Sequence, residues 1–317
     1  IDPPIKDHLF FTVTDCTKLH TVSGRRRPEP EPEGSPMPIM PRTLGLLALL
    51  ASAPLAAQAS EPTANNVSAD FTIYVGGALF VEGDFSAQIL DDDYALRTNM
   101  KTAGIAERFY PAQYKLLSEG LMHEEHVEPQ RFVSDTKAKK NARVLRLTYD
   151  GERMPLLSAI PPYDKDELEE VKPALTRNTQ DPVSAFLIPV SDTANPCART
   201  LPIFDGRRRY NLTLAYQEKK TLKLEGSQKP VDAIVCTIRY EAIAPPAKKR
   251  RFTNMLKRND AIKIWLAPFG NGRVYMPVRF ELPTPIGSAV MMLKNLEEKQ
   301  IALSTDKDST RFALSEQ

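Results

Sequence analysis

Apolar and polar residues alternate through much of this chain, and the alternation is clearest in residues 70–90. Every second residue from Phe71 to Val75 is strongly apolar, and the Gly76-Gly77 pair then interrupts the run. Apolar residues alternate with Asp, Ser and Gln again between 84 and 89. A period of two residues is that of a β-strand with one buried face, and paired glycines favour a tight bend. The pattern therefore predicts two strands joined by a glycine turn.

Similar runs recur along the rest of the chain with few long interruptions. They cover residues 114–122, 142–151, 203–214, 236–243, 261–269, 273–282 and 286–296. Turn signals such as Asp150-Gly151, Asp205-Gly206 and Asn271-Gly272 separate or end them. About ten consecutive strands with short connections predict an all-β antiparallel meander.

Signals for helices are few. Residues 163–175 form an acidic, surface-like segment in which Pro173 would end a helix. Residues 181–190 place Asp181 at an N-cap and Pro182 at the first helical position, which predicts a short helix that covers one end of a curved sheet. The chain is thus expected to contain one or two short helices.

The segment 37–59 has the layout of a secretory signal peptide. A basic residue, Arg42, precedes an apolar run at 44–53, and Pro54 and Ala57-Gln58-Ala59 follow. The run is shorter than the roughly 20 apolar residues that span a bilayer, so a membrane anchor is the weaker alternative. Cleavage is expected between Ala59 and Ser60, and because the residue directly after the cleavage site is a serine and not a cysteine, a lipoprotein anchor is not expected.

Residues 1–36 precede the signal and carry the low-complexity run RRRPEPEPEGSP. We interpret them as an upstream extension or a disordered segment, with an unusually long signal n-region as the alternative. The expected organisation is therefore 1–36 as that extension, 37–59 as the signal peptide and 60–317 as a single periplasmic β domain.

Two cysteines, Cys197 and Cys236, remain after Ser60. An even pair in an exported chain indicates a disulfide. The alternative is a reactive Cys197 thiolate favoured by the arginines at 207–209, but no nearby histidine could act as its base. The sequence therefore predicts a bond between Cys197 and Cys236.

Charge gives a largely negative result. Of 42 basic and 40 acidic residues, six of each precede Ser60, so 36 and 34 remain. This balance gives no support to nucleic-acid binding. One local cluster stands out, because Lys248, Lys249, Arg250 and Arg251 precede apolar residues at helical spacing. It predicts contact with an anionic membrane surface or another envelope component, and a solvated connection between two strands is the alternative.

The hairpin at 203–214 supplies another candidate site. The alternation places Tyr210, Leu212 and Leu214 on one face, and parity adds Arg208 to that face. A guanidinium beside an apolar face needs a partner. Arg208 is therefore expected either to pair with an internal carboxylate or, with Tyr210, to bind an anionic group of a ligand.

Motifs of catalysis are not found. His123-Glu124-Glu125-His126 matches no zinc-protease spacing and precedes Pro129, so we interpret it as a solvated loop rather than a metal site. Nucleophile-elbow, P-loop and dinucleotide-binding patterns are also absent. The sequence predicts no cofactor, no metal and no enzymatic activity.

Several stretches together resemble one family. They are IYVGGALFVEGDFSAQI, YALRTNMKTAGIAERFY, SEGLM, DPVSAFL, PCARTLPIFDGRRRYNLTL and LPTPIGSAVMML. In this order they are similar to domain of unknown function 3108, a family of exported proteins of Gram-negative bacteria, and FDGRRRY is the most specific stretch. The resemblance implies a periplasmic or outer-envelope β-protein shaped like the half-open barrels that carry lipoproteins, and it implies no known reaction.

The sequence-based expectation is thus an all-β, antiparallel protein with a strongly curved sheet or half-open barrel. Its expected role is non-catalytic, in the periplasm, binding a lipid, a lipopeptide or a protein segment during envelope maintenance. A structural or interaction protein with a filled core is the alternative, and an enzyme acting on envelope polymers is a more distant one. The sequence fixes neither the ligand nor the oligomeric state.

Overall fold

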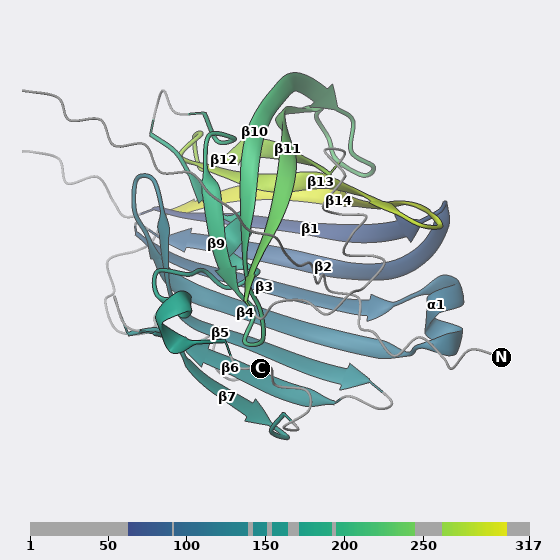
Figure 1. Ribbon diagram of the computed structural model, residues 1–317. Coiled ribbons are helices and arrows are strands. Elements are labelled where there is room, and N and C mark those ends of the chain that lie inside the picture. Colours follow the sequence, from purple (N-terminus) through teal and green to yellow (C-terminus); the bar gives the residue numbers. More distant parts are fainter. Residues whose placement is uncertain are drawn as a thin grey trace, which may run out of the picture. The chain divides into compact units, whose positions relative to one another are not determined.

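A computed structural model describes residues 63–90, 92–138, 142–150, 154–163, 171–191, 195–244 and 262–302. These residues form one sheet built from two antiparallel meanders (Figure 1). The first meander comprises β1 (Thr63–Val75), β2 (Ala78–Leu90), β3 (Asp93–Thr102), β4 (Ala112–Met122), β5 (Val127–Ala138), β6 (Arg143–Thr148) and β7 (Leu156–Ile160). The second comprises β9 (Thr200–Phe204), β10 (Arg209–Leu222), β11 (Val231–Ala244), β12 (Lys263–Phe269), β13 (Val274–Thr284) and β14 (Gly287–Ala302).

The two meanders are joined by their first and last strands. β1 pairs with β14 from Thr63 opposite Ala302 to Val75 opposite Ala289. The strand order runs from β7 through β1 and β14 to β9, so β7 and β9 are the edges and the sheet does not close. The predicted all-β, antiparallel, open architecture is therefore confirmed.

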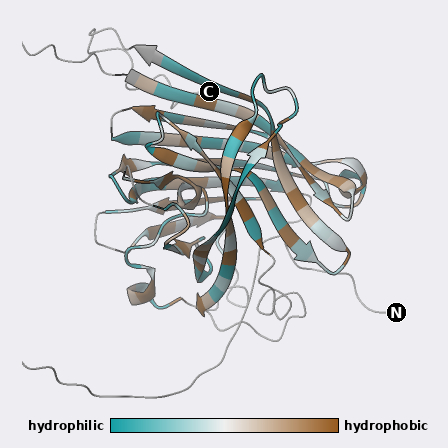
Figure 2. Ribbon diagram, turned by 90° about the horizontal axis from the view of Figure 1, so that it is seen from above, coloured by the Kyte–Doolittle hydropathy of each residue, from teal (hydrophilic) through white to brown (hydrophobic). Residues whose placement is uncertain are grey.

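The glycine turn predicted after Val75 is also present. β1 and β2 pair antiparallel around Gly76 and Gly77, whose φ angles of 57° and 85° lie in the left-handed region that favours glycine. Hydrophobic and hydrophilic residues alternate along the strands, as Figure 2 shows. This alternation gives the sheet one face that can be buried.

The second meander folds back over the first. In Figure 1, strands β9 to β12 cross the strands of the first meander at a steep angle. Side chains from both meanders, including Leu96, Leu147, Val235 and Trp265, form one buried apolar cluster. The tip of the β9–β10 hairpin packs against β6, because a Cβ built on Gly206 would lie 2.6 Å from Leu145 Cδ1. The inner face of the sheet is thus covered by the protein's own strands.

A second apolar cluster lies within the second meander and includes Ile238, Ile264 and Leu282. Cys197 and Cys236 belong to this cluster and form the predicted disulfide, with their Cα atoms 5.6 Å apart. Both side chains are fully buried. The bond fixes the segment before β9 to the middle of β11.

The remaining elements are short. α1 (Gly104–Phe109) follows β3, the 3-10 turns η1 (Pro173–Thr176) and η2 (Ser184–Phe186) precede β9, and β8 (Ile188–Pro189) pairs with β13. The helix expected at 181–190 is thus reduced to the single turn η2. No helix in the described segments is long and apolar enough to cross a bilayer.

Candidate functional site

β9 is an edge strand whose outer side is only partly covered. Gln180 forms a parallel bridge with Ile203: its N–H donates to Pro202 O at 2.8 Å, and its C=O accepts from Phe204 N at 2.9 Å. Arg199 O accepts from Leu214 N in β10, so by alternation the main chain of Thr200 faces outward. Asn178, with φ of 52°, turns the chain away before it reaches Thr200. Among the described residues, no strand or bridge pairs with the outward side of Thr200.

A groove of about 570 Å³ opens beside this uncovered edge. Its walls are residues 125–129, Tyr149, residues 178–180, Leu187, Pro189 and residues 198–202. They come from the β4–β5 loop and the start of β5, the residue after β6, the segments on both sides of η2, and the start of β9 with the two residues before it. The groove is therefore assembled from parts of the chain that are far apart in sequence.

Three side chains of the groove carry a buried polar atom without a hydrogen-bond partner. They are the Tyr149 hydroxyl, Gln180 Oε1 and Arg199 Nε. Only six such atoms occur in the described part of the chain, so half of them gather at one site. A buried polar group without a partner costs about 1–3 kcal/mol. A rotation of each side chain toward the groove would expose these atoms to a ligand, and a ligand that offers both donors and acceptors would then remove this cost.

Each of these side chains is held by its backbone or by its neighbours. The Tyr149 N–H donates to Gln130 O at 2.9 Å, and burial raises the pKa of its hydroxyl far above the ordinary value. Arg199 donates from Nη1 to Glu125 O at 3.3 Å, which leaves Nε free. Burial lowers the pKa of the Arg199 guanidinium, and the nearby Glu125 opposes that shift.

A buried aspartate supports the groove from beneath. Asp181, next to Gln180, is fully buried and accepts three hydrogen bonds: from Ser118 Oγ at 2.7 Å, Val183 N at 2.8 Å and Ser184 N at 3.0 Å. Burial raises the pKa of the Asp181 carboxyl, and these hydrogen bonds oppose the increase. The Asp181 carboxylate thus holds the turn that leads into η2, whose N-cap is Val183 and not the predicted Asp181, and it also links that turn to β4.

The loop His123-Glu124-Glu125-His126 forms the rim. All four residues are exposed, as the interpretation as a solvated loop implies. His123 Nε2 lies 3.2 Å from Glu128 Oε2, the two imidazoles stack 4.5 Å apart, and Ser191 Oγ donates to Glu125 at 3.3 Å. No group of three or more metal-binding side chains occurs in the segments that the structure describes. The sequence did not indicate that this loop borders a groove.

Arg208 and Tyr210 lie in the β9–β10 hairpin and are not part of the groove wall. Arg208 precedes β10, within the turn, so strand parity does not extend to it. The turn is closed by Asp205, whose Oδ1 accepts from Arg207 N at 2.9 Å and Arg208 N at 2.7 Å. Burial raises the pKa of Asp205, and the Arg208 charge is the largest effect that lowers it. This proximity supports the internal-carboxylate alternative for Arg208.

Tyr210 stacks on Tyr240 with ring centroids 5.1 Å apart. Its side chain packs against the second apolar cluster, where Leu214 is buried. A role for Arg208 and Tyr210 in binding a ligand remains a proposal. The basic residues Lys248, Lys249, Arg250 and Arg251 lie outside the described residues, as does the segment 37–59.

Comparison with known proteins gives a family but no activity. The model of the family DUF3108, described as a protein of unknown function, matches residues 70–294. No curated protein matches the chain. A crystal structure of a β-barrel-like protein of domain of unknown function DUF1849 from Brucella abortus is 11% identical, with a TM-score of 0.42. The match covers 75% of this chain and 98% of that one.

Proposed function

We propose that this chain, which belongs to the DUF3108 family, is a non-catalytic protein of the cell envelope that binds an extended protein segment in the groove beside β9. The observation that carries the proposal is the gathering of three unpartnered buried polar atoms in that groove. Gln180 Oε1 needs a donor and Arg199 Nε needs an acceptor. An extended peptide presents both at regular intervals along its main chain.

The uncovered main chain of Thr200, at the start of β9, favours a peptide over a lipid. A strand that binds along an edge bonds to main-chain groups like those of Thr200 and places alternate side chains in neighbouring hollows. A lipid or lipopeptide, the other ligands in the original expectation, needs a large apolar cavity. The inner face of this sheet is instead filled by the two apolar clusters. A structural protein without a ligand remains the second candidate because its core would look the same.

The groove gives little support to an enzyme on envelope polymers. Glycoside hydrolysis needs two carboxyl groups that face each other across the substrate. The carboxylates of this groove, Glu125 and Glu128, already interact with Ser191 and His123. We therefore keep the non-catalytic proposal.

Removing the Tyr149 hydroxyl should weaken ligand binding without lowering the stability of the fold. Replacing Tyr149 by phenylalanine removes a buried hydroxyl that has no partner, so the free energy of unfolding should stay the same or rise by up to about 1 kcal/mol. In the matched control Tyr94→Phe, the lost hydroxyl lies 3.5 Å from Ser118 Oγ, and stability should fall by about 1 kcal/mol. Chemical denaturation of the three proteins measures both changes.

The binding experiment uses a displayed library of random octapeptides. Peptides enriched on the wild-type protein should bind Tyr149→Phe and Gln180→Leu at least about tenfold more weakly in fluorescence anisotropy, which corresponds to one lost hydrogen bond of about 1.4 kcal/mol. N-methylation of alternate peptide bonds should abolish binding, because it removes the main-chain donors. Absence of enriched peptides, or equal binding by both variants, would favour the structural alternative.

Location in the periplasm is part of the proposal. The tripartite segment 37–59 supports it, and a disulfide between buried cysteines is typical of an oxidising compartment. N-terminal sequencing of the protein from the periplasmic fraction should begin at Ser60. If the periplasmic protein still contained Met40, the signal segment would not have been removed, and export by this signal would be contradicted. The basic residues 248–251 remain proposed to contact anionic envelope components.

A further inference from the structure

One end of the sheet carries an unusual concentration of exposed apolar side chains. Ten large apolar side chains are exposed in the described residues, and five of them lie at this end: Tyr74, Ile105, Phe109, Tyr110 and Ile286. They come from the end of β1, from α1 with the residue that follows it, and from the β13–β14 turn. We call these five residues the apolar tip patch. All three elements lie at the same end in Figure 1.

The turns that carry the patch touch one another. A Cβ built on Gly76, in the β1–β2 turn, would lie 2.4 Å from Ile286 O. A Cβ built on Gly104, at the start of α1, would lie 2.6 Å from Leu79 O in β2. The segments that carry the patch are therefore close neighbours at this end of the sheet.

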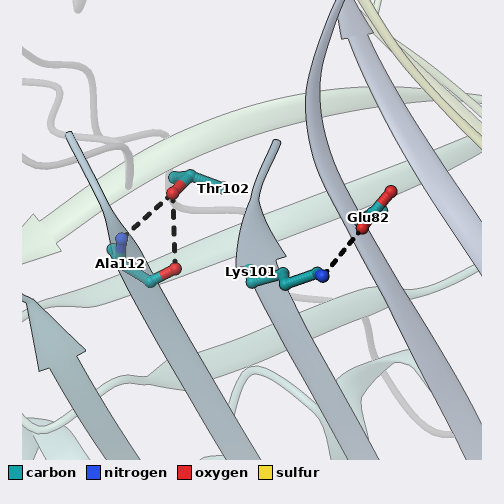
Figure 3. A network of polar contacts seen from close by, with 4 residues as sticks. All are labelled: Glu82, Lys101, Thr102 and Ala112. Atoms are coloured by element: carbon teal, nitrogen blue, oxygen red, sulfur yellow. Dashed lines mark hydrogen bonds and ion pairs between the residues drawn. The ribbon is translucent and has the colours of Figure 1, made fainter. Parts of the chain in front are cut away.

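The helix α1 presents its apolar residues outward. Ala106 is buried against the sheet, whereas Ile105 and Phe109, four positions apart, are 57% and 67% exposed. A polar clamp holds the base of this segment (Figure 3): the Thr102 hydroxyl accepts from Ala112 N at 3.0 Å and donates to Ala112 O at 3.4 Å. Ala103 N donates to Phe80 O at 2.8 Å. The apolar side chains are thus held outward by a fixed backbone.

Charged residues around the patch have a small basic excess. Lys101, Arg108 and Lys137 are exposed at this end, against Glu82 and Glu107. Glu82 is already neutralised by Lys101, with Nζ and Oε1 3.0 Å apart (Figure 3). Outside this pair, Arg108 and Lys137 stand against Glu107, and this small positive excess suits a surface with negative headgroups.

The size and form of the patch fit a lipid surface better than a second copy of the chain. Five large side chains that are roughly 60% exposed offer about 600 Å² of apolar area, and each partner in a stable dimer buries about 800 Å². The side chains also project from separate turns and do not form a flat face. Apolar tips with basic neighbours are typical of segments that enter the headgroup region of a bilayer. We infer that the apolar tip patch docks the protein on the surface of an anionic membrane.

Flotation with vesicles tests this inference. The purified protein should bind vesicles of phosphatidylethanolamine and phosphatidylglycerol, and the triple variant Ile105→Ser, Phe109→Ser, Ile286→Ser should bind at least about tenfold more weakly. A matched control removes as many exposed apolar side chains elsewhere: Leu156→Ser, Leu175→Ser, Tyr216→Ser. The control should bind as the wild type does. Equal binding by the two triple variants would overturn the inference.

Fluorescence gives an independent measurement. The chain has one tryptophan, Trp265, which is buried, so its emission should not respond to vesicles. In the variant Phe109→Trp, a blue shift with vesicles is expected, together with quenching by brominated lipid. An unchanged spectrum would overturn the inference. Self-association of the wild type in ultracentrifugation, if the triple variant abolished it, would also overturn the inference. It would show that the patch binds a second copy of the chain.

Salt separates this surface from the basic segment 248–251. Binding by apolar insertion should largely persist at 0.5 M salt, where the Debye length falls to about 4 Å. Vesicle binding could instead disappear at this salt concentration and also when residues 248–251 are changed to Gln. That result would assign membrane contact to the basic segment. Peptide binding in the groove should be unaffected by the triple variant, so the two proposals fail independently.

Discussion

Replacing Asp181 by alanine is expected to lower the free energy of unfolding by about 3 kcal/mol. The change leaves Ser118 Oγ and the N–H groups of Val183 and Ser184 buried without their acceptor. Relief of the buried carboxyl offsets part of this cost. Asp181→Asn keeps an acceptor oxygen and should lose only about 1 kcal/mol. Asp84, which binds Asn99 at an exposed site, is the matched control, and Asp84→Ala should cost less than about 0.5 kcal/mol.

Asp181 should also make the stability of the wild type depend on pH in a way that the stability of Asp181→Asn does not. The folded-state pKa of Asp181 is raised above its ordinary value of 3.8, so the folded protein binds the proton more tightly than the unfolded chain does. The contribution of Asp181 is therefore most favourable below about pH 4 and declines as pH rises toward the folded-state pKa. Denaturation of wild type and Asp181→Asn across this range should show the wild type losing stability relative to the variant. The opposite slope would mean that the three hydrogen bonds dominate over burial.

Removing the disulfide is expected to have the second large effect. Cys197 and Cys236 are 39 positions apart, and opening a loop of this length costs about 4 kcal/mol in the chain-entropy model. For a domain of this size, the melting temperature of the double variant Cys197→Ala, Cys236→Ala should fall by roughly 8–16 °C. Reductant should lower the melting temperature of the wild type and leave that of the double variant unchanged. Alkylation of both thiols shows that the reductant has opened the bond. If the melting temperature of the wild type did not change under these conditions, the prediction would be contradicted.

The disulfide also bears on the groove. Cys197 lies two residues before Arg199, and its N–H donates to Asn195 Oδ1 at 2.9 Å. Loss of the bond should free the start of β9 and weaken peptide binding even at temperatures where the double variant stays folded. Anisotropy measurements on the folded double variant can separate this local effect from global unfolding.

The strands were predictable where one face is buried and the other is polar. Residues 70–90 show this pattern, and β1 and β2 follow it. β5 was not predicted, because Pro129 and several charged residues hide its alternation. Pro129 lies opposite Gly120, where the β4–β5 register shifts, so the strand accommodates a residue that normally interrupts a ladder. α1 was also missed, since six residues are too few to show a helical period.

The groove was not predictable from the sequence because its polar atoms come from separate segments. Tyr149, Gln180 and Arg199 have no common spacing, and each follows or precedes residues that resemble a solvated loop. Their burial arises from tertiary packing, since Tyr149, for example, packs against the apolar cluster to which both meanders contribute. Asp181 shows the same limit, because its bonds to the N–H groups of Val183 and Ser184 are local, whereas its bond to Ser118 in β4 joins segments far apart in the sequence.

The pairing of β1 with β14 sets the order in which the chain can become stable. As the chain leaves the ribosome or a translocation channel, β1 finds one neighbour, β2, at once, but its other edge stays unpaired until residues 287–302 arrive. During that interval a strand of 13 residues exposes main-chain donors and acceptors to other chains. The fold is therefore complete only when β14 has paired with β1. A chain cut before β14 would keep an unpaired β1 edge that can associate with other chains.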